Sequence, residues 1–205
     1  MKTVDRFMKH VEKEVTKSGI TFLPVKKTYV SVEGNVRVSG YFDTGDMVLA
    51  VAMGLPEIEW LAVLVHEYSH FRQFKENCKA WKQTTVKGED VCDTIFLFVG
   101  SNHKVIPKRI LKDHTARVRN VELDCEKRTV RNIRKFSLPL DIPSYIQKAN
   151  SYLYFYNYAL LRKRWWRPDK SPYRNGKVWS EFPTYFKRRY HGLPKKYVEL
   201  YDSYC

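Results

Sequence analysis

The feature that most constrains this chain is the apolar segment Trp60–Phe74, which contains the pattern HExxH at His66, Glu67 and His70. Residues four positions apart lie one turn apart on the same face of an α-helix, so both imidazoles can reach one metal ion. Glu67 stands beside them and can reach a water at that ion. Two neutral nitrogen donors, an open coordination position and a carboxylate base are typical of a catalytic zinc site.

The residues before the motif decide between this interpretation and a simpler one. Solvated His and Glu residues at the wet end of a surface helix would show the same pattern. However, the run from Ile58 to Val65 is apolar nearly all round, which indicates a buried helix. Buried His and Glu side chains need polar partners, so the context favours a metal site.

A second segment can complete the site. Lys108–Lys135 has helical periodicity, with a break expected near Asp113-His114, and Glu122 and Glu126 fall inside its apolar stripe. Buried carboxylates are costly unless each has a partner. A zinc ion bound by the two histidines and Glu122 would satisfy one carboxylate, and Glu126 could accept the free ring N–H of a liganded histidine. The alternative is that both acids form surface pairs with the many arginines nearby.

These residues together resemble the gluzincin branch of the zincin metallopeptidases, which pairs HExxH on one helix with a glutamate on a later helix. The resemblance covers residues 26–134 and implies His66, His70 and Glu122 as zinc ligands, Glu67 as general base and Glu126 as the acid that orients the first histidine. It also implies a sheet in which one strand, near Met47–Met53, pairs with extended peptide substrate. The chain is similar in its overall look to uncharacterised metallopeptidases of large tailed bacteriophages.

Two departures leave the assignment of the acids open. The orienting position is usually aspartate in this family, and Val121 stands where an asparagine is frequent. Either Asp124 or Glu126 could therefore exchange roles with Glu122. Zincins commonly stabilise the oxyanion with a Tyr or a His, for which a tyrosine, His114 and His191 are the candidates.

The whole chain is expected to have an α+β, zincin-like fold, in which a small antiparallel sheet packs on the HExxH helix and a mostly helical C-terminal part follows. The predicted domains are a core, 1–136, and a basic, aromatic-rich extension packed on it, 137–205. Val91–Val99 is ambiguous between helix and strand. Two further helices are predicted, Thr3–Ser18 and Tyr145–Arg164. Three strands, Lys26–Val32, Asn35–Tyr41 and Met47–Met53, are predicted to form an antiparallel meander. Its turns are expected at Glu33-Gly34 and Thr44-Gly45.

Charge and cysteine content limit the partners and the compartment. The net charge is +15, and residues 162–196 hold twelve Lys or Arg against two acids. This stretch could bind nucleic acid, with its aromatic residues stacking on bases. Alternatively, its aromatic residues could cover a core, which is the prediction we favour.

The four cysteines show no metal-finger spacing. With no secretory signal or membrane span expected, they predict reduced thiols and a cytoplasmic protein, a Cys78–Cys92 bridge being the alternative.

The sequence therefore predicts a zinc-dependent (Zn²⁺) metallopeptidase that acts on protein or peptide substrates. Two alternatives differ from it in class. A DNA-associated, SprT-like protease would use the basic C-terminal region, although that family has a third histidine as ligand. A non-catalytic protein could keep the metal site for stability alone, although such a site has no need of Glu67.

Overall fold

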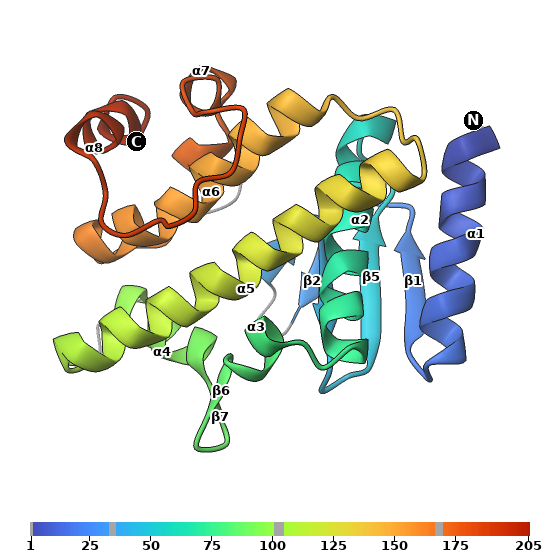
Figure 1. The fold of residues 1–205 in the computed structure, drawn as a ribbon, viewed down its shortest axis with the longest axis horizontal. Coiled ribbons are helices and arrows are strands. Elements are labelled where there is room, and N and C mark those ends of the chain that lie inside the picture. The colour runs from blue at the N-terminus through green and yellow to red at the C-terminus, as the bar shows by residue number, and fades with distance from the viewer. Residues whose placement is uncertain (1, 33–35, 101–104, 167–169) are drawn as a thin grey trace. The chain divides into compact units, whose positions relative to one another are not determined.

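The computed structural model describes residues 2–32, 36–100, 105–166 and 170–205, and shows an α+β chain in which helices predominate. The chain divides into two compact units that alternate along the sequence. The first unit comprises Met1–Cys78 and Cys125–Asp141, and the second comprises Lys79–Asp124 and Ile142–Cys205. Helix α5, Lys108–Lys135, passes without a break from the second unit into the first, so the break expected near Asp113 is absent (Figure 1).

The first unit contains a three-stranded sheet in the order β1-β5-β4. Strand β5 (Val48–Ala52) is central; it pairs in parallel with β1 (Thr21–Val25) and antiparallel with β4 (Gly40–Asp43). A separate antiparallel pair joins β2 (Val30–Val32) to β3 (Val36–Val38). The predicted three-stranded antiparallel meander is thus wrong in two respects.

The first error is the parallel strand β1, which the sequence analysis did not include. The second is that the chain changes sheets between Val38 and Gly40. The turn predicted at Glu33-Gly34 lies outside the described residues. The turn at Thr44-Gly45 does join two paired strands, β4 and β5.

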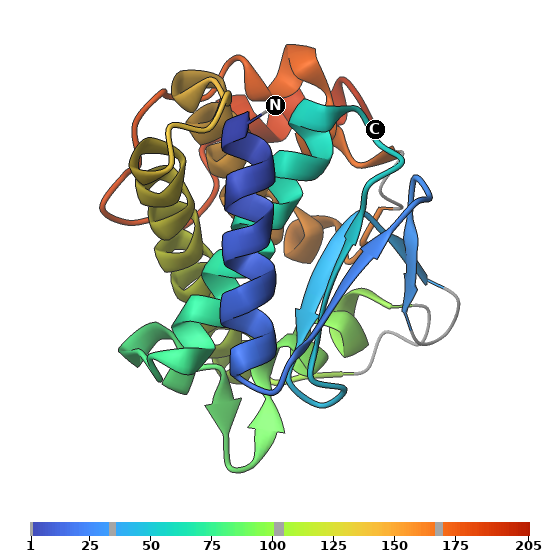
Figure 2. The same ribbon diagram turned by 90° about the vertical axis from the view of Figure 1, so that its right-hand side faces the viewer.

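Two helices cover one face of this sheet. Helix α1 (Lys2–Lys17) contacts β1, helix α2 (Glu57–Lys75) contacts β4 and β5, and the two helices contact each other (Figure 2). The buried residues of α1 are Val4, Phe7, Val11 and Val15, which form the apolar stripe that the periodicity predicts. Gly19 ends the helix in the left-handed conformation, at φ 75°, which costs a glycine little.

The opposite face of β5 packs on the β2–β3 pair. Ala50 and Ala52 form a buried cluster with Val30, whereas Leu49 and Val51, which alternate with them, are also fully buried. A strand that is apolar on both faces is expected to be covered on both, and β5 is.

Helix α2 is held in the first unit by polar contacts as well as by its apolar residues. Tyr68 Oη donates to Glu14 of α1 at 3.1 Å. From the C-terminal part of α5, Thr129 Oγ1 donates to the buried Ser69 Oγ at 3.0 Å, and Arg128 pairs with Glu76 at 2.5 Å. These contacts fix α2 between α1, the sheet and α5.

The second unit is mostly helical. A short hairpin of β6 (Thr85–Val86) and β7 (Glu89–Asp90) leads into α4 (Val91–Val99), whose N-terminus is capped by Asp90. The ambiguous segment Val91–Val99 is therefore a helix. The remaining elements are α3 (Lys79–Lys82), α6 (Ile142–Arg162), the 3₁₀ turn η3 (Pro172–Arg174), α7 (Gly176–Trp179) and α8 (Lys195–Asp202).

Helix α6 is the centre of the second unit. Its buried aromatic residues pack against residues that follow it in the chain, in a cluster that includes Phe155, Trp166, Phe182, Tyr190 and Tyr197. Most of the aromatic residues in the basic segment 162–196 thus belong to the core or pack against it, as predicted for this segment. Residues 167–169 of the segment lie outside the described residues. In the parts of the chain that the structure describes, no helix has both the length and the apolar character needed to cross a membrane.

Candidate metal centre

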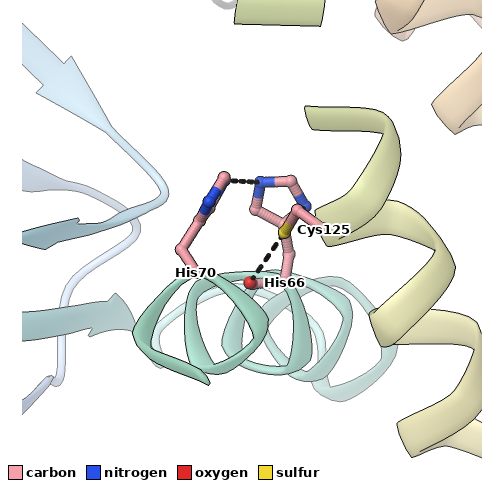
Figure 3. A group of neighbouring side chains, drawn as sticks. All are labelled: His66, His70 and Cys125. Carbon is pink, nitrogen blue, oxygen red and sulfur yellow. Dashed lines mark hydrogen bonds between the residues drawn. The ribbon is translucent and has the colours of Figure 1, made fainter. Parts of the chain in front are cut away.

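Helix α2 brings the two motif histidines together. His66 Nε2 and His70 Nε2 lie 3.2 Å apart, and the ring centroids are 4.7 Å apart with the rings nearly perpendicular (Figure 3). Two nitrogens bound at about 2.0–2.1 Å to one tetrahedral zinc ion would be about 3.4 Å apart. The two imidazoles therefore already have the spacing that a shared ion requires.

The Nδ1 atoms of both rings, which are the outer nitrogens of the pair, also have partners in the first unit. Glu126 Oε1 lies 3.3 Å from His66 Nδ1, and Gln73 Oε1 lies 2.9 Å from His70 Nδ1. An oxygen acceptor at Nδ1 keeps the proton on that nitrogen and turns the Nε2 lone pair toward a metal. Glu126 and Gln73 are both buried, at 5% and 0% exposure.

Gln73 was not a sequence candidate for this site. It stands three residues after His70 on α2, so helical spacing alone could have placed the two side chains on neighbouring positions. A glutamine at the polar end of a helix gave no reason to expect it to be buried.

Cys125 is a second residue that the sequence analysis did not assign to the site. Its Sγ donates to the carbonyl oxygen of His66 at 3.3 Å and lies 3.7 Å from His66 Nδ1 (Figure 3). His66, His70 and Cys125 each offer a donor atom, and these atoms lie within 4.8 Å of one another. In the sequence, Cys125 falls in the apolar stripe of its helix, where a cysteine gives no sign of a ligand because cysteine is among the most buried residue types.

The electrostatic surroundings of His66 favour its protonated form. Burial by itself lowers the pKa of this imidazole, but the neighbouring acidic groups of Cys125 and Glu126 raise it, and the net pKa is well above the usual value. A site that attracts a proton to His66 also attracts a metal cation, because the same negative groups stabilise either charge.

Glu122, the predicted third ligand, stands one helical turn before Glu126 on α5. The two carboxylates therefore lie on the same side of this helix, and Glu122 is also buried, at 9% exposure. Glu122 belongs to the second unit, in which Tyr156 Oη donates to its Oε1 at 3.4 Å. Asp124, the other acid considered for this role, is half-buried on the same helix.

Glu67 is half-buried and lies on the side of α2 that faces strand β4. A Cβ atom added to Gly40, the first residue of β4, would be 3.5 Å from Glu67 Cγ and only 2.5 Å from Val63 Cγ1. The absence of a side chain at Gly40 thus lets β4 run directly alongside the residues that carry the motif.

The two histidines considered for oxyanion stabilisation both belong to the second unit. His114 shares a hydrogen bond of 2.7 Å between its Nδ1 and Thr94 Oγ1, and His191 is exposed. None of the four cysteines forms a disulfide, so the alternative Cys78–Cys92 bridge is absent.

The first unit therefore brings together side chains that can bind a metal ion. No protein-family model, curated protein sequence or solved structure gives a significant match to this chain.

Proposed function

We propose that this protein is a zinc-dependent peptidase whose centre is built on His66 and His70, with Glu67 as general base. The observation that carries the proposal is the Nε2–Nε2 separation of 3.2 Å between two imidazoles whose outer nitrogens face Glu126 and Gln73. In a histidine-bound zinc site, one ring nitrogen of each ligand binds the ion and the other donates a hydrogen bond to the protein, and both rings are placed for this.

Zinc would supply Lewis acidity, which lowers the pKa of a water molecule toward neutrality and polarises a peptide carbonyl. Glu67 would accept the proton from the attacking water and pass it to the leaving nitrogen. Glu122 is proposed as the third ligand, because it precedes Glu126 by one turn on a continuous helix.

Strand β4 is proposed to hold the substrate. It is one of the two edge strands in the order β1-β5-β4, and no other strand among the described residues pairs with its outer side. Met47–Met53, near which the resemblance implied the substrate strand, holds the central strand β5, which already pairs on both sides. An extended peptide added antiparallel to an exposed edge gains main-chain hydrogen bonds, and β4 runs beside Glu67.

The test combines metal analysis with peptide cleavage. Glu67→Gln should keep one zinc per chain by elemental analysis and lose about 10²–10⁴-fold in cleavage of a peptide library followed by mass spectrometry. His66→Ala and His70→Ala should lose both zinc and activity. Glu57→Gln, in the exposed first turn of the same helix, is the matched control and should change neither. Full activity of Glu67→Gln would refute its assignment as base.

A second candidate function follows from Cys125. A Cys125 thiolate lies close enough to both histidines to take the coordination position that a catalytic zinc site leaves to water, as protein ligands do in structural zinc sites. In that case chelation of zinc would lower the melting temperature, whereas wild-type protein and Glu67→Gln would be equally inactive on every peptide.

A further inference from the structure

A large open cavity in the second unit is lined by an unusual excess of cationic side chains. Its volume is 1090 Å³, and it is formed by the β6–β7 hairpin, α4, the beginning of α5 and His191. Among the described residues, two carboxylates line it, Glu89 and Asp113. Six cationic side chains of the same described part line it: Lys87, Lys108, Arg109, Lys112, Arg117 and Arg119.

The cations of this cavity are poorly neutralised by the protein itself. Asp113 pairs with Arg117 at 2.7 Å. The exposed side chains of Lys108, Arg109 and Lys112 make no ion pair with any residue that the structure describes. The cavity therefore presents a positive field that an anionic ligand would neutralise.

Arg119 is the strongest single indication of an anionic ligand. It is only 8% exposed, and its guanidinium donates to the neutral Asn157 side chain rather than to a carboxylate. Burial lowers its pKa, which reflects the cost of a buried charge without a countercharge nearby. An acidic group of a ligand could supply that countercharge at the cavity wall.

The apolar part of the lining indicates which kind of anion would bind. It is aliphatic, and two of its members are unusually exposed, Leu97 at 46% and Ile110 at 44%. Among the described residues, no Phe, Tyr or Trp lines the cavity, so the large aromatic side chains that most often stack on bases are absent from this lining. Exposed aliphatic residues rimmed by charge are typical of a surface that binds protein.

We propose that this cavity binds an acidic peptide segment of a protein partner, in which carboxylates alternate with aliphatic side chains. The carboxylates contact Arg109, Lys112 and Arg119, and the aliphatic side chains cover Leu97 and Ile110. The proposal concerns the second unit alone and does not depend on the metal centre.

A binding assay with the full chain tests this directly. The probe is a short fluorescein-labelled peptide that alternates Glu with Leu, followed by fluorescence anisotropy. Arg109→Glu combined with Lys112→Glu should weaken binding at least about tenfold, a loss of about 1.4 kcal/mol. Acidic residues suit the first turns of a helix, so α5 should still form. The matched control is Lys9→Glu combined with Lys17→Glu, two exposed residues of α1, which changes the net charge equally and should weaken binding less than about twofold.

Three results would overturn the proposal. If the Arg109→Glu, Lys112→Glu variant and the control variant lost the same affinity, the loss would come from the change in overall charge and not from the cavity. Equal affinity for a peptide alternating Glu with Ser would show that the aliphatic lining is not used. Tighter binding of a single-stranded oligodeoxythymidine than of the Glu-Leu peptide would identify nucleic acid as the ligand instead.

Arg119→Met separates a binding role from a structural one. Removal of an uncompensated buried charge should leave the melting temperature unchanged or higher, while affinity for the Glu-Leu peptide should fall at least about fivefold. A lower melting temperature with unchanged affinity would show that Arg119 serves the fold only.

Discussion

Glu126 Oε1 lies 3.3 Å from His66 Nδ1, on the side of the ring opposite the nitrogen that faces His70. This contact joins the two helices of the candidate centre, α2 and α5, through a single carboxylate. It assigns the two nitrogens of His66 to different tasks, since Nδ1 faces the protein and Nε2 faces the second histidine.

Glu126→Gln should lower zinc affinity about 10–100-fold without abolishing binding, because the amide can still orient the ring but carries no negative charge. Competition with a chromogenic chelator measures the affinity. Glu122→Gln is the informative comparison, because a lost ligand should cost more than a lost orienting group. If the two variants ranked in the opposite order, the roles of the two glutamates would be exchanged.

Cys125→Ser distinguishes a carboxylate third ligand from a thiolate one. With Glu122 as the ligand, the variant should retain zinc at the wild-type affinity, and the cobalt-substituted wild-type protein should lack the intense near-ultraviolet band of thiolate-to-cobalt charge transfer. A strong band that disappears in Cys125→Ser would identify Cys125 as a ligand and favour the closed, structural site.

Gly40→Ala should disturb the contact between β4 and α2. The new Cβ would lie 2.5 Å from Val63 Cγ1 and 2.8 Å from the backbone oxygen of Ala50, so it cannot be accommodated by a side-chain movement alone. We expect a loss of about 1–3 kcal/mol in unfolding free energy, measured by urea denaturation. Gly45→Ala is the control, because its new Cβ would meet only a side-chain oxygen, Asp43 Oδ1, at 3.2 Å. Equal losses in both variants would mean that the approach at Gly40 has no special cost.

Acid should weaken the link between the C-terminal end of α2 and α5. Burial tends to raise the pKa of Glu76, but the hydrogen bonds from Arg128 and Arg72 outweigh it and hold the pKa below its usual value. A carboxyl group whose pKa is lowered in the folded state stabilises it above the unfolded-state pKa, and this stabilisation is lost as pH falls through the folded-state pKa. The wild-type protein should therefore have a higher melting temperature than Glu76→Gln near neutral pH, and the difference should shrink once the pH falls below the unfolded-state pKa of about 4.3.

Both proteins should be compared in the presence of a chelator, so that loss of zinc at low pH does not contribute. A difference between their melting temperatures that stays constant down to about pH 3 would contradict the assignment of Glu76 as the titrating group.

The long helices α1, α2, α5 and α6 were predictable because of their length and their apolar patterns, whereas the short helices α3, α7 and α8 were not predicted. Helix α2 begins directly after Pro56, and α5 and α6 lie close to their predicted bounds. Strand β1 was not predictable, because Pro24 within it argues against a strand and its partly exposed residues show no alternation. Its parallel pairing with β5 requires a long crossover connection, which here contains β2, β3 and β4 and which no local pattern encodes.

The candidate site was predictable only in part, for a related reason. A motif names His66, Glu67 and His70 because a helix fixes their mutual positions. Cys125 lies beside His66 only through the packing of α5 against α2, and a cysteine in an apolar stripe looks like any other small core residue.

The alternation of the two units along the chain sets an order on folding during synthesis. The first 78 residues contain α1, the sheet and α2, but not the part of α5 that supplies Thr129 and Arg128 to them. All residues up to about 141 must therefore leave the ribosome before the first unit can be complete. Until then Glu126 cannot contact His66. The two residues are far apart in the sequence, and bringing them together closes a long stretch of chain at a cost in entropy, which is a barrier to assembly of the first unit.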